Sequence, residues 1–319
     1  MTSEAGTCEN TCRTAADIEA VVTSFNQGAL ILEAVQSLCA QTVLPGKIIV
    51  VDDGSTDEAS IRILKELECG WESPVPVEVL YKENGGVSSA RNAGIRSTMA
   101  PFVLVLDGDD RLEPAYIARV SALLRGNPSM VAASSWMRTF GVLDAVVCPA
   151  GGHLVPFLSR NCCPASYILR RKAFVQCGGY DETMRRGFED WDFFLSMLET
   201  TPDAVIGMVE EPLIDYRTNP VSSNIKSMES RLELMRYIME KHRDSYRDHV
   251  IDAMLGIEAV SMGRLYAWEE EITDSLKRQK TISGASGKFL GSPSYGDGGM
   301  ASAVRVASCF PEGWTEEKL

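Results

Sequence analysis

VLVLDGDD, residues 103–110, is a run of four apolar residues that leads into a cluster of three carboxylates. A short apolar run bounded by turn residues is typical of a strand that is buried on both faces of a parallel sheet. In an open α/β sheet, ligands bind at the carboxyl ends of such strands. Acidic side chains crowded at one strand end repel each other unless a cation lies among them, and Mg²⁺ and Mn²⁺ prefer such oxygen ligands. The stretch alone therefore predicts either a metal site or a solvated acidic turn.

The flanking sequence alternates between strand and helix patterns. We expect strands at 18–23, 47–51 and 77–81, each followed by a turn and a helical segment, before the central strand at 102–106. This β-α-β-α-β-α-β order predicts an α/β fold, with a mainly parallel central sheet, right-handed crossovers and flanking helices.

Composition narrows the cellular setting. Lys and Arg number 31 and Asp and Glu 44, so the 319-residue chain has a net charge of −13. This charge argues against general binding to nucleic acid or to an anionic membrane. No apolar run reaches the ~20 residues of a transmembrane helix, and the N-terminus lacks a signal-peptide core. Nine cysteines without a paired framework fit a reducing compartment, so we expect a cytoplasmic protein without a transmembrane segment.

Polar and aromatic side chains follow three of the predicted strands. Thr23 and Phe25 follow the first, Asp53 the second, and Asp107 and Asp109 the central strand. A nucleotide fits this arrangement, because a carboxylate accepts from a base N–H, an aromatic ring stacks on the base, and a metal holds the diphosphate. Taken singly, Asp53 also fits a helix cap and Phe25 fits core packing. Neither GxGxxG nor GxxxxGK(S/T) is present, which argues against a dinucleotide fold of that type and against a P-loop.

Four motifs occur in order along this half of the chain: VTSFN at 22–26, VDDGSTD at 51–57, NGGV with ARN within 84–92, and DGDD at 107–110. Together they resemble the nucleotide-binding half of a family 2 glycosyltransferase of the GT-A fold. The resemblance implies an inverting transferase that moves a sugar from a nucleotide-diphosphate sugar, with a UDP-sugar favoured, to an acceptor hydroxyl. It also implies a divalent cation, Mn²⁺ or Mg²⁺.

The resemblance also implies roles for single residues. Thr23 and Asp53 would contact the base, Arg91 the nucleotide side, and Asp107 and Asp109 the ribose and the metal. The third carboxylate of the cluster could share the metal, because the register of the motif is ambiguous.

A second acidic motif, GFEDWDFF at 187–194, opens a predicted helix. Carboxylates in the first turn of a helix are favoured by the helix dipole, which is the structural alternative to a catalytic role. The resemblance implies that Asp190 is the general base and that Glu189 is a helper or an acceptor ligand. Trp191 fits either an acceptor platform or the core.

One position departs from the family pattern. Residues 213–217, LIDYR, resemble the last strand of the catalytic domain, which many family members follow with a histidine two residues on. Here that place is Asn219, which coordinates metal only weakly through its amide oxygen. The departure puts metal affinity or donor geometry in doubt.

Composition and hydrophobic pattern divide the chain into four segments. We expect a disordered tail at 1–16, a GT-A catalytic domain at 17–220 with a nucleotide-binding half (17–116) and an acceptor half (117–220), a helical extension at 221–280, and a Gly/Ser-rich tail or lid at 281–319.

The helical extension carries apolar stripes. Residues Met228, Leu232, Met235 and Ile238 predict one amphipathic helix, and Ile251, Leu255, Met262 and Leu265 predict another. Such stripes are typical of core packing, and a homodimer through these C-terminal helices is the alternative.

Two other functions keep the same fold. A catalytically silent sugar-nucleotide-binding protein would have no need for Asp109 and Asp190 together. A nucleotidyltransferase also uses paired acids, but its Gly-rich N-terminal phosphate loop is missing here. The acceptor stays open between a glycan, a lipid-linked sugar, a peptide and a small molecule.

Overall fold

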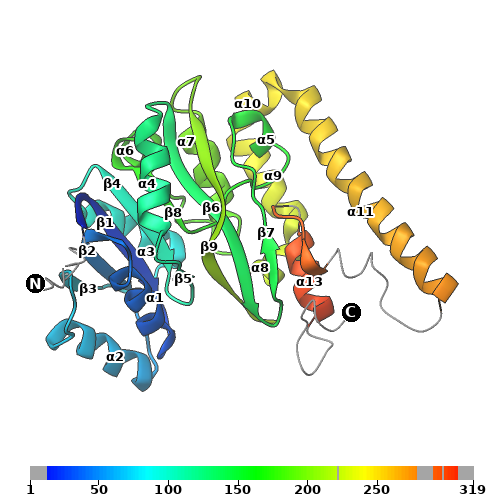
Figure 1. Cartoon of the computed structure of the whole chain (residues 1–319). Coiled ribbons are helices and arrows are strands. Elements are labelled where there is room, and N and C mark those ends of the chain that lie inside the picture. The colour runs from blue at the N-terminus through cyan, green and yellow to red at the C-terminus, as the bar shows by residue number, and fades with distance from the viewer. Residues whose placement is uncertain (1–12, 221–222, 279–289, 297, 308–319) are drawn as a thin grey trace, which may run out of the picture.

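One mixed sheet organises the chain, and the acidic strand β4 (Phe102–Asp107) lies inside it (Figure 1). The structure is a computed structural model that describes residues 13–220, 223–278, 290–296 and 298–307. The other strands are β1 (Arg13–Ser24), β2 (Val43–Asp52), β3 (Val77–Tyr81), β5 (Arg111–Leu112), β6 (Met130–Gly141), β7 (Ala145–Val147), β8 (Tyr167–Arg170) and β9 (Val205–Thr218).

The strand order is β3-β2-β1-β4-β8-β6-β9-β5, and β7 pairs with β6. Strands β1 to β4 are mutually parallel where they pair, which confirms the parallel nucleotide-binding half. β8 then runs antiparallel to both β4 and β6, whereas β6 and β9 are parallel. The first half therefore presents its carboxyl strand ends along one edge, as the sequence predicts.

Both faces of the sheet are buried, which explains the unbroken apolar run of β4. Its Val103 and Val105 face one core, and its Leu104 and Leu106 face the other. The first core is covered by α3 (Val87–Ser97), α5 (Leu154–Phe157), α6 (Arg171–Cys177) and α7 (Glu189–Leu198), and the second by α1 (Leu30–Cys39), α2 (Glu58–Cys69) and α4 (Tyr116–Gly126). A strand between two apolar layers has no polar face to display.

The first two strands begin earlier than the sequence pattern predicts. Residues 13–16 belong to β1, because Arg13, Thr14 and Ala15 pair with the start of β2. The prediction of a disordered tail is therefore wrong for these residues. Residues 1–12 lie outside the described part of the chain. The sequence pattern does not predict the first residues of β2, because Pro45 and Gly46 are unfavourable in a strand interior.

The C-terminal part consists of α8 (Ser223–Glu229), α9 (Arg231–Lys241), α10 (Arg243–Asp248), α11 (Val250–Arg278) and α13 (Gly299–Ala307). Figure 1 shows α11 projecting away from the sheet, whereas α13 lies against α8. Within the described ranges, no helix combines the length and apolar content that crossing a membrane requires.

The predicted apolar stripes are only partly buried. Met235 and Ile238 are in the core, but Leu232 is 85% exposed, because the predicted single helix breaks at Ser230 into α8 and α9. Ile251 is 70% exposed, so core packing is wrong for this end of α11. The homodimer through these helices stays a prediction.

A buried charge network fixes α9 on α7. The fully buried Asp192 carboxylate of α7 accepts from Lys241 Nζ at 2.8 Å and lies 3.1 Å from His242 Nε2. The other ring nitrogen of His242 lies 2.9 Å from a Glu199 carboxylate oxygen. Only the imidazolium supplies two donors for these two carboxylates. Burial alone would lower the pKa of His242, but the bonds to Asp192 and Glu199 outweigh burial and raise it to about 9.

This network predicts a pH-dependent stability. A raised folded-state pKa contributes stability that is complete below the unfolded value of 6.5 and is lost as the pH rises through about 9. The difference in unfolding free energy between wild type and His242→Gln should shrink by about 1–3 kcal/mol across that window, measured by urea unfolding. A difference that stays constant or grows with pH would contradict the assigned imidazolium.

Candidate active site

Two strand ends meet through a pair of predicted donor-site residues. Thr23 and Asp107 are register partners at the ends of β1 and β4. The Thr23 hydroxyl donates to an Asp107 carboxylate oxygen at 3.2 Å. The structure therefore brings these two side chains together at the edge of the sheet, as parallel pairing requires. Their contacts with nucleotide stay predictions.

The Asp53 carboxylate accepts hydrogen bonds from the turn that precedes α3. It accepts from Lys82 Nζ at 2.6 Å and from the backbone N–H groups of Gly85 and Gly86 at 3.0 and 2.7 Å. Gly86 has φ of +88°, a left-handed conformation that places this turn before α3. The helix-cap alternative for Asp53 is wrong, because Asp57 caps α2 instead. The predicted contact of Asp53 with a base is untested.

Phe25 lies just beyond β1 and is 47% exposed. The core-packing alternative is therefore wrong for this ring. An exposed aromatic side chain next to the donor-side strand ends keeps the predicted stacking on a base open.

Arg91 connects the two acidic motifs. Arg91 belongs to α3, and its side chain is buried. Its Nη2 donates to both carboxylate oxygens of Asp107 at 2.8 and 2.9 Å. Its Nη1 donates to Glu189 at 2.9 Å, and the guanidinium lies 5.4 Å from the ring centroid of Tyr180. The sequence predicts Arg91 as a nucleotide contact, whereas the geometry shows a buried cation shared by two carboxylates.

Backbone strain positions the second acidic motif. Gly187 and Phe188 have φ of +111° and +64°, so two left-handed residues in succession precede α7. A Cβ at Gly187 would lie 2.4 Å from the Cβ of Ser227, which makes glycine a steric requirement. A non-glycine residue in the left-handed region is unfavourable and often marks a functional site. The turn directs Glu189 and Asp190 to different partners.

Of this pair, Glu189 is ion-paired with Arg91, whereas Asp190 has no ion pair with any residue that the structure describes. It accepts from the Asn161 side-chain amide at 2.9 Å and from the backbone N–H of Trp191 at 2.8 Å. Burial and the charge of Glu189 raise the pKa of Asp190 to about 7. A carboxylate with such a pKa gains and loses a proton readily near neutral pH. Sequence reasoning missed Asn161, because no local pattern marks its contact with Asp190.

Trp191 belongs to the core. It is 1% exposed, and its indole N–H donates to the backbone carbonyl of Phe157 at 2.6 Å. Although its edge borders the pocket, the ring packs inside the protein, so the acceptor-platform interpretation is not supported.

A pocket of about 170 Å³ is lined by residues of both acidic motifs, whereas Thr23, Phe25, Asp53 and Asp109 are not among its lining residues. Arg91 and Asp107 line its donor side, and Asp190 lies in its wall. Tyr216 of β9 and Tyr295, close to the C-terminus, complete the lining. The convergence of β4, α3, α7 and the C-terminal segment on one pocket makes it the candidate active site.

Two family models match the chain. The model described as Glycosyl transferase family 2 matches residues 19–146, and the model described as Glycosyltransferase like family 2 matches residues 129–237. The chain is a member of glycosyltransferase family 2.

Its relatives are distant. The uncharacterised glycosyltransferase EpsJ of Bacillus subtilis is 27% identical over 64% of this chain and 62% of that protein. An uncharacterised glycosyltransferase of Haemophilus influenzae is 24% identical over 73% of this chain and 80% of that protein. Chondroitin synthase of Escherichia coli is 25% identical over 57% of this chain and 26% of that protein. The chain thus spans less than two thirds of the length of EpsJ.

A solved structure shares the fold. S. aureus TarS, in its complex with UDP-GlcNAc, matches with a TM-score of 0.53 at 19% identity, over 69% of this chain and 65% of that chain. At this identity the likeness shows the fold alone, which is the GT-A fold that the sequence predicts.

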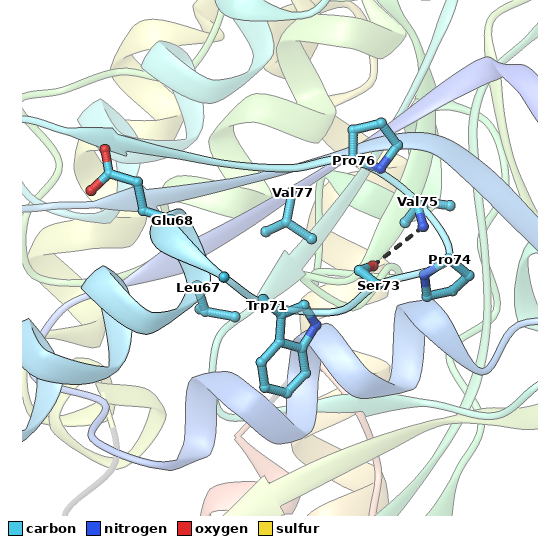
Figure 2. Close-up of a pocket in the computed structure, with 9 residues that line it drawn as sticks. Leu67, Glu68, Trp71, Ser73, Pro74, Val75, Pro76 and Val77 are labelled. Atoms are coloured by element: carbon cyan, nitrogen blue, oxygen red, sulfur yellow. Dashed lines mark hydrogen bonds between the residues drawn. The ribbon is translucent and has the colours of Figure 1, made fainter.

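A second hollow, of about 410 Å³, lies elsewhere (Figure 2). It is lined by the loop between α2 and β3, where Trp71 lies beside Pro74 and Val75. Its one charged lining residue is Glu68. The hollow is at the amino end of β3, away from the carboxyl strand ends where α/β sheets bind ligands, and it is not the active site.

The divalent cation at the acidic cluster stays a prediction, and the chemistry of the carboxylates there bears on it. Burial and the charge of Asp107 raise the pKa of Asp109 to about 6, because two carboxylates crowd one strand end. Among the described residues, no side chain donates a hydrogen bond to the Asp109 carboxylate, and no three acidic, Cys or His groups form a complete ligand set. One or two carboxylates together with substrate phosphates are the ligands that Mg²⁺ commonly uses.

Asp110 differs from its neighbours. It is buried, its carboxylate accepts from the backbone N–H of Arg217 at 2.8 Å, and burial raises its pKa well above the ordinary range. Asp110 therefore ties the turn after β4 to β9, and Asp107 and Asp109 are the better candidates for a metal.

Proposed function

We propose that the chain is an inverting, metal-dependent glycosyltransferase that moves a sugar from a UDP-sugar to an acceptor hydroxyl. The observation that carries this proposal is the convergence on one pocket of Asp107, at the donor-side strand ends, and Asp190, a carboxylate held by Asn161. Family membership and the UDP-GlcNAc complex of the TarS structure support the donor class.

Asp190 is the general base of the proposed reaction. It removes the proton of the acceptor hydroxyl while that oxygen forms a bond to the anomeric carbon. The bond between the anomeric carbon and the diphosphate oxygen breaks, and the diphosphate leaves with the electron pair on the opposite face. One displacement of this kind inverts the configuration at the anomeric carbon.

Glu189 has a different role from Asp190. Its carboxylate is paired with the buried guanidinium of Arg91. Through this ion pair it fixes the first turn of α7, and so it positions Asp190. The structure thus supports the assignment of the base to the second acid of the motif.

Asp107 and Asp109 would hold Mn²⁺ or Mg²⁺ together with the donor diphosphate. Such a cation supplies charge neutralisation for the leaving diphosphate. Arg91 does not take over this role, because its two terminal nitrogens, Nη1 and Nη2, donate to Glu189 and Asp107. The carboxylates themselves orient the donor relative to Asp190.

Replacement of the proposed base separates chemistry from donor binding. Asp190→Asn keeps the shape of the side chain and removes its proton acceptor. We expect transfer from a UDP-sugar to fall by about 10²–10⁴-fold, with donor affinity near that of wild type, because the donor side lies on β1, β2 and β4. Initial rates of UDP release and calorimetric donor titrations measure the two quantities.

The matched control is Glu189→Gln, which should reduce transfer less than Asp190→Asn does. If Glu189→Gln abolishes transfer and Asp190→Asn does not, the base assignment is wrong. If both variants transfer at the wild-type rate, the proposed mechanism fails.

The metal proposal has its own test. Asp109→Ala should abolish Mn²⁺-dependent binding of UDP-sugar while the far-ultraviolet circular dichroism spectrum stays unchanged. The reason is that the one side-chain contact of Asp109 among the described residues, from Arg217 Nε, goes to its backbone carbonyl, which alanine keeps. Calorimetry with and without a chelator measures this binding. Equal affinity of wild type and variant under both conditions would show that Asp109 holds no metal.

A further inference from the structure

The pocket is incomplete without residues close to the C-terminus. Tyr295, Gly296, Gly298 and Met300 line it together with Asp190. None of the four glycosyltransferase motifs extends beyond residue 110, and the family models end at residue 237. The part of the pocket lining that these residues form therefore lies outside the region that the family models match.

The C-terminal segment is anchored by its own small core. Leu290, Ala301 and Val304 are buried against Leu143 and Ile225. The backbone N–H of Met300 also bonds to the carbonyl of Ser294 at 3.0 Å, which closes the loop over the pocket.

The segment lies in direct contact with the residue that orients the proposed base. Gly296 has φ of +81°, and a Cβ there would lie 1.6 Å from the backbone carbonyl oxygen of Asn161. The Asn161 side chain in turn donates to Asp190 at 2.9 Å. Backbone contact as close as this leaves the segment little freedom beside the proposed base.

Two tyrosines flank Asp190 from opposite parts of the chain. The Tyr295 hydroxyl donates to the backbone carbonyl of Cys163 at 2.9 Å, so its ring is held in place. Tyr216 enters from β9. Burial and the charge of Asp190 raise the pKa of Tyr295 well above its ordinary value, and burial and the surrounding carboxylates do the same for Tyr216. Both tyrosines stay neutral and offer an apolar ring with a polar tip.

We propose that Tyr295 and Tyr216 form the acceptor subsite and that the acceptor is a sugar ring. A pyranose has an apolar C–H face that packs on an aromatic ring, and its hydroxyls present one proton to Asp190. An extended peptide needs a sheet edge or a long groove, whereas this pocket has a volume of about 170 Å³. The inference rests on the proposed glycosyl transfer and adds the class of acceptor.

The test uses the full chain with Mn²⁺ and the best donor among UDP-GlcNAc, UDP-glucose and UDP-galactose. Acceptor probes are the methyl β-glycosides of the same three sugars, compared with glycerol and a serine-containing peptide. Tyr295→Ala should raise the KM for the glycoside by roughly 3- to 10-fold and lower the ratio of transfer to hydrolysis, because one aromatic contact is lost. Tyr295→Phe, which keeps the ring, should restore most of the affinity.

Two further variants separate the subsite from general effects. Tyr237→Ala removes an exposed tyrosine of α9 that does not line the pocket, and it should leave the glycoside KM unchanged. Gly296→Ala should displace the segment and raise that KM as Tyr295→Ala does. Its control is Gly263→Ala, where no atom lies within 4 Å of the added Cβ. Calorimetric donor affinity shows that each variant is folded.

The inference is overturned if Tyr295→Ala has the same KM for the glycoside as the wild-type protein. It is also overturned if the wild-type protein transfers sugar to glycerol or to the peptide as fast as to the glycosides. In both cases the proposed glycosyl transfer survives. If wild type neither hydrolyses nor transfers from any of the three donors, the proposed function itself fails and the acceptor subsite falls with it.

Discussion

The buried guanidinium of Arg91 is the interaction on which the site depends. It is 2% exposed, and such a charge is tolerated inside a protein only when carboxylates compensate it. Asp107 supplies one from the end of β4, and Glu189 supplies the other from the first turn of α7. Two carboxylates far apart in the sequence are thereby fixed to one cation, and the donor-side sheet is joined to the helix that carries the proposed base.

This constraint separates two adjacent carboxylates in function. Both carboxylates line the pocket, but Glu189 accepts from Arg91 in an ion pair, whereas Asp190 accepts from the side-chain amide of Asn161. The left-handed residues Gly187 and Phe188 allow the chain to make this division at the start of α7. A regular helix start would place both acids on the helix surface, where they would complement the dipole and nothing more.

Local pattern was enough to predict part of this arrangement. The apolar run of β4 and its acidic end follow from burial on two faces, and the motif around Asp190 follows from the family resemblance. Sequence patterns could not predict that Asn161 contacts Asp190 or that Tyr295 lines the pocket. Both contacts depend on packing between segments that are distant in the sequence and share no hydrophobic periodicity. The cap alternative for Asp53 failed for a similar reason, since a distant turn competes for the same carboxylate.

The most direct test of the central interaction is a double-mutant cycle in unfolding free energy between Asp107→Asn and Glu189→Gln. If both carboxylates compensate Arg91, the double variant should be less stable than the sum of the single effects predicts, by about 0.5–3 kcal/mol, because it leaves the buried guanidinium without an anion. Additive effects, within about 0.5 kcal/mol, would contradict the shared ion pair.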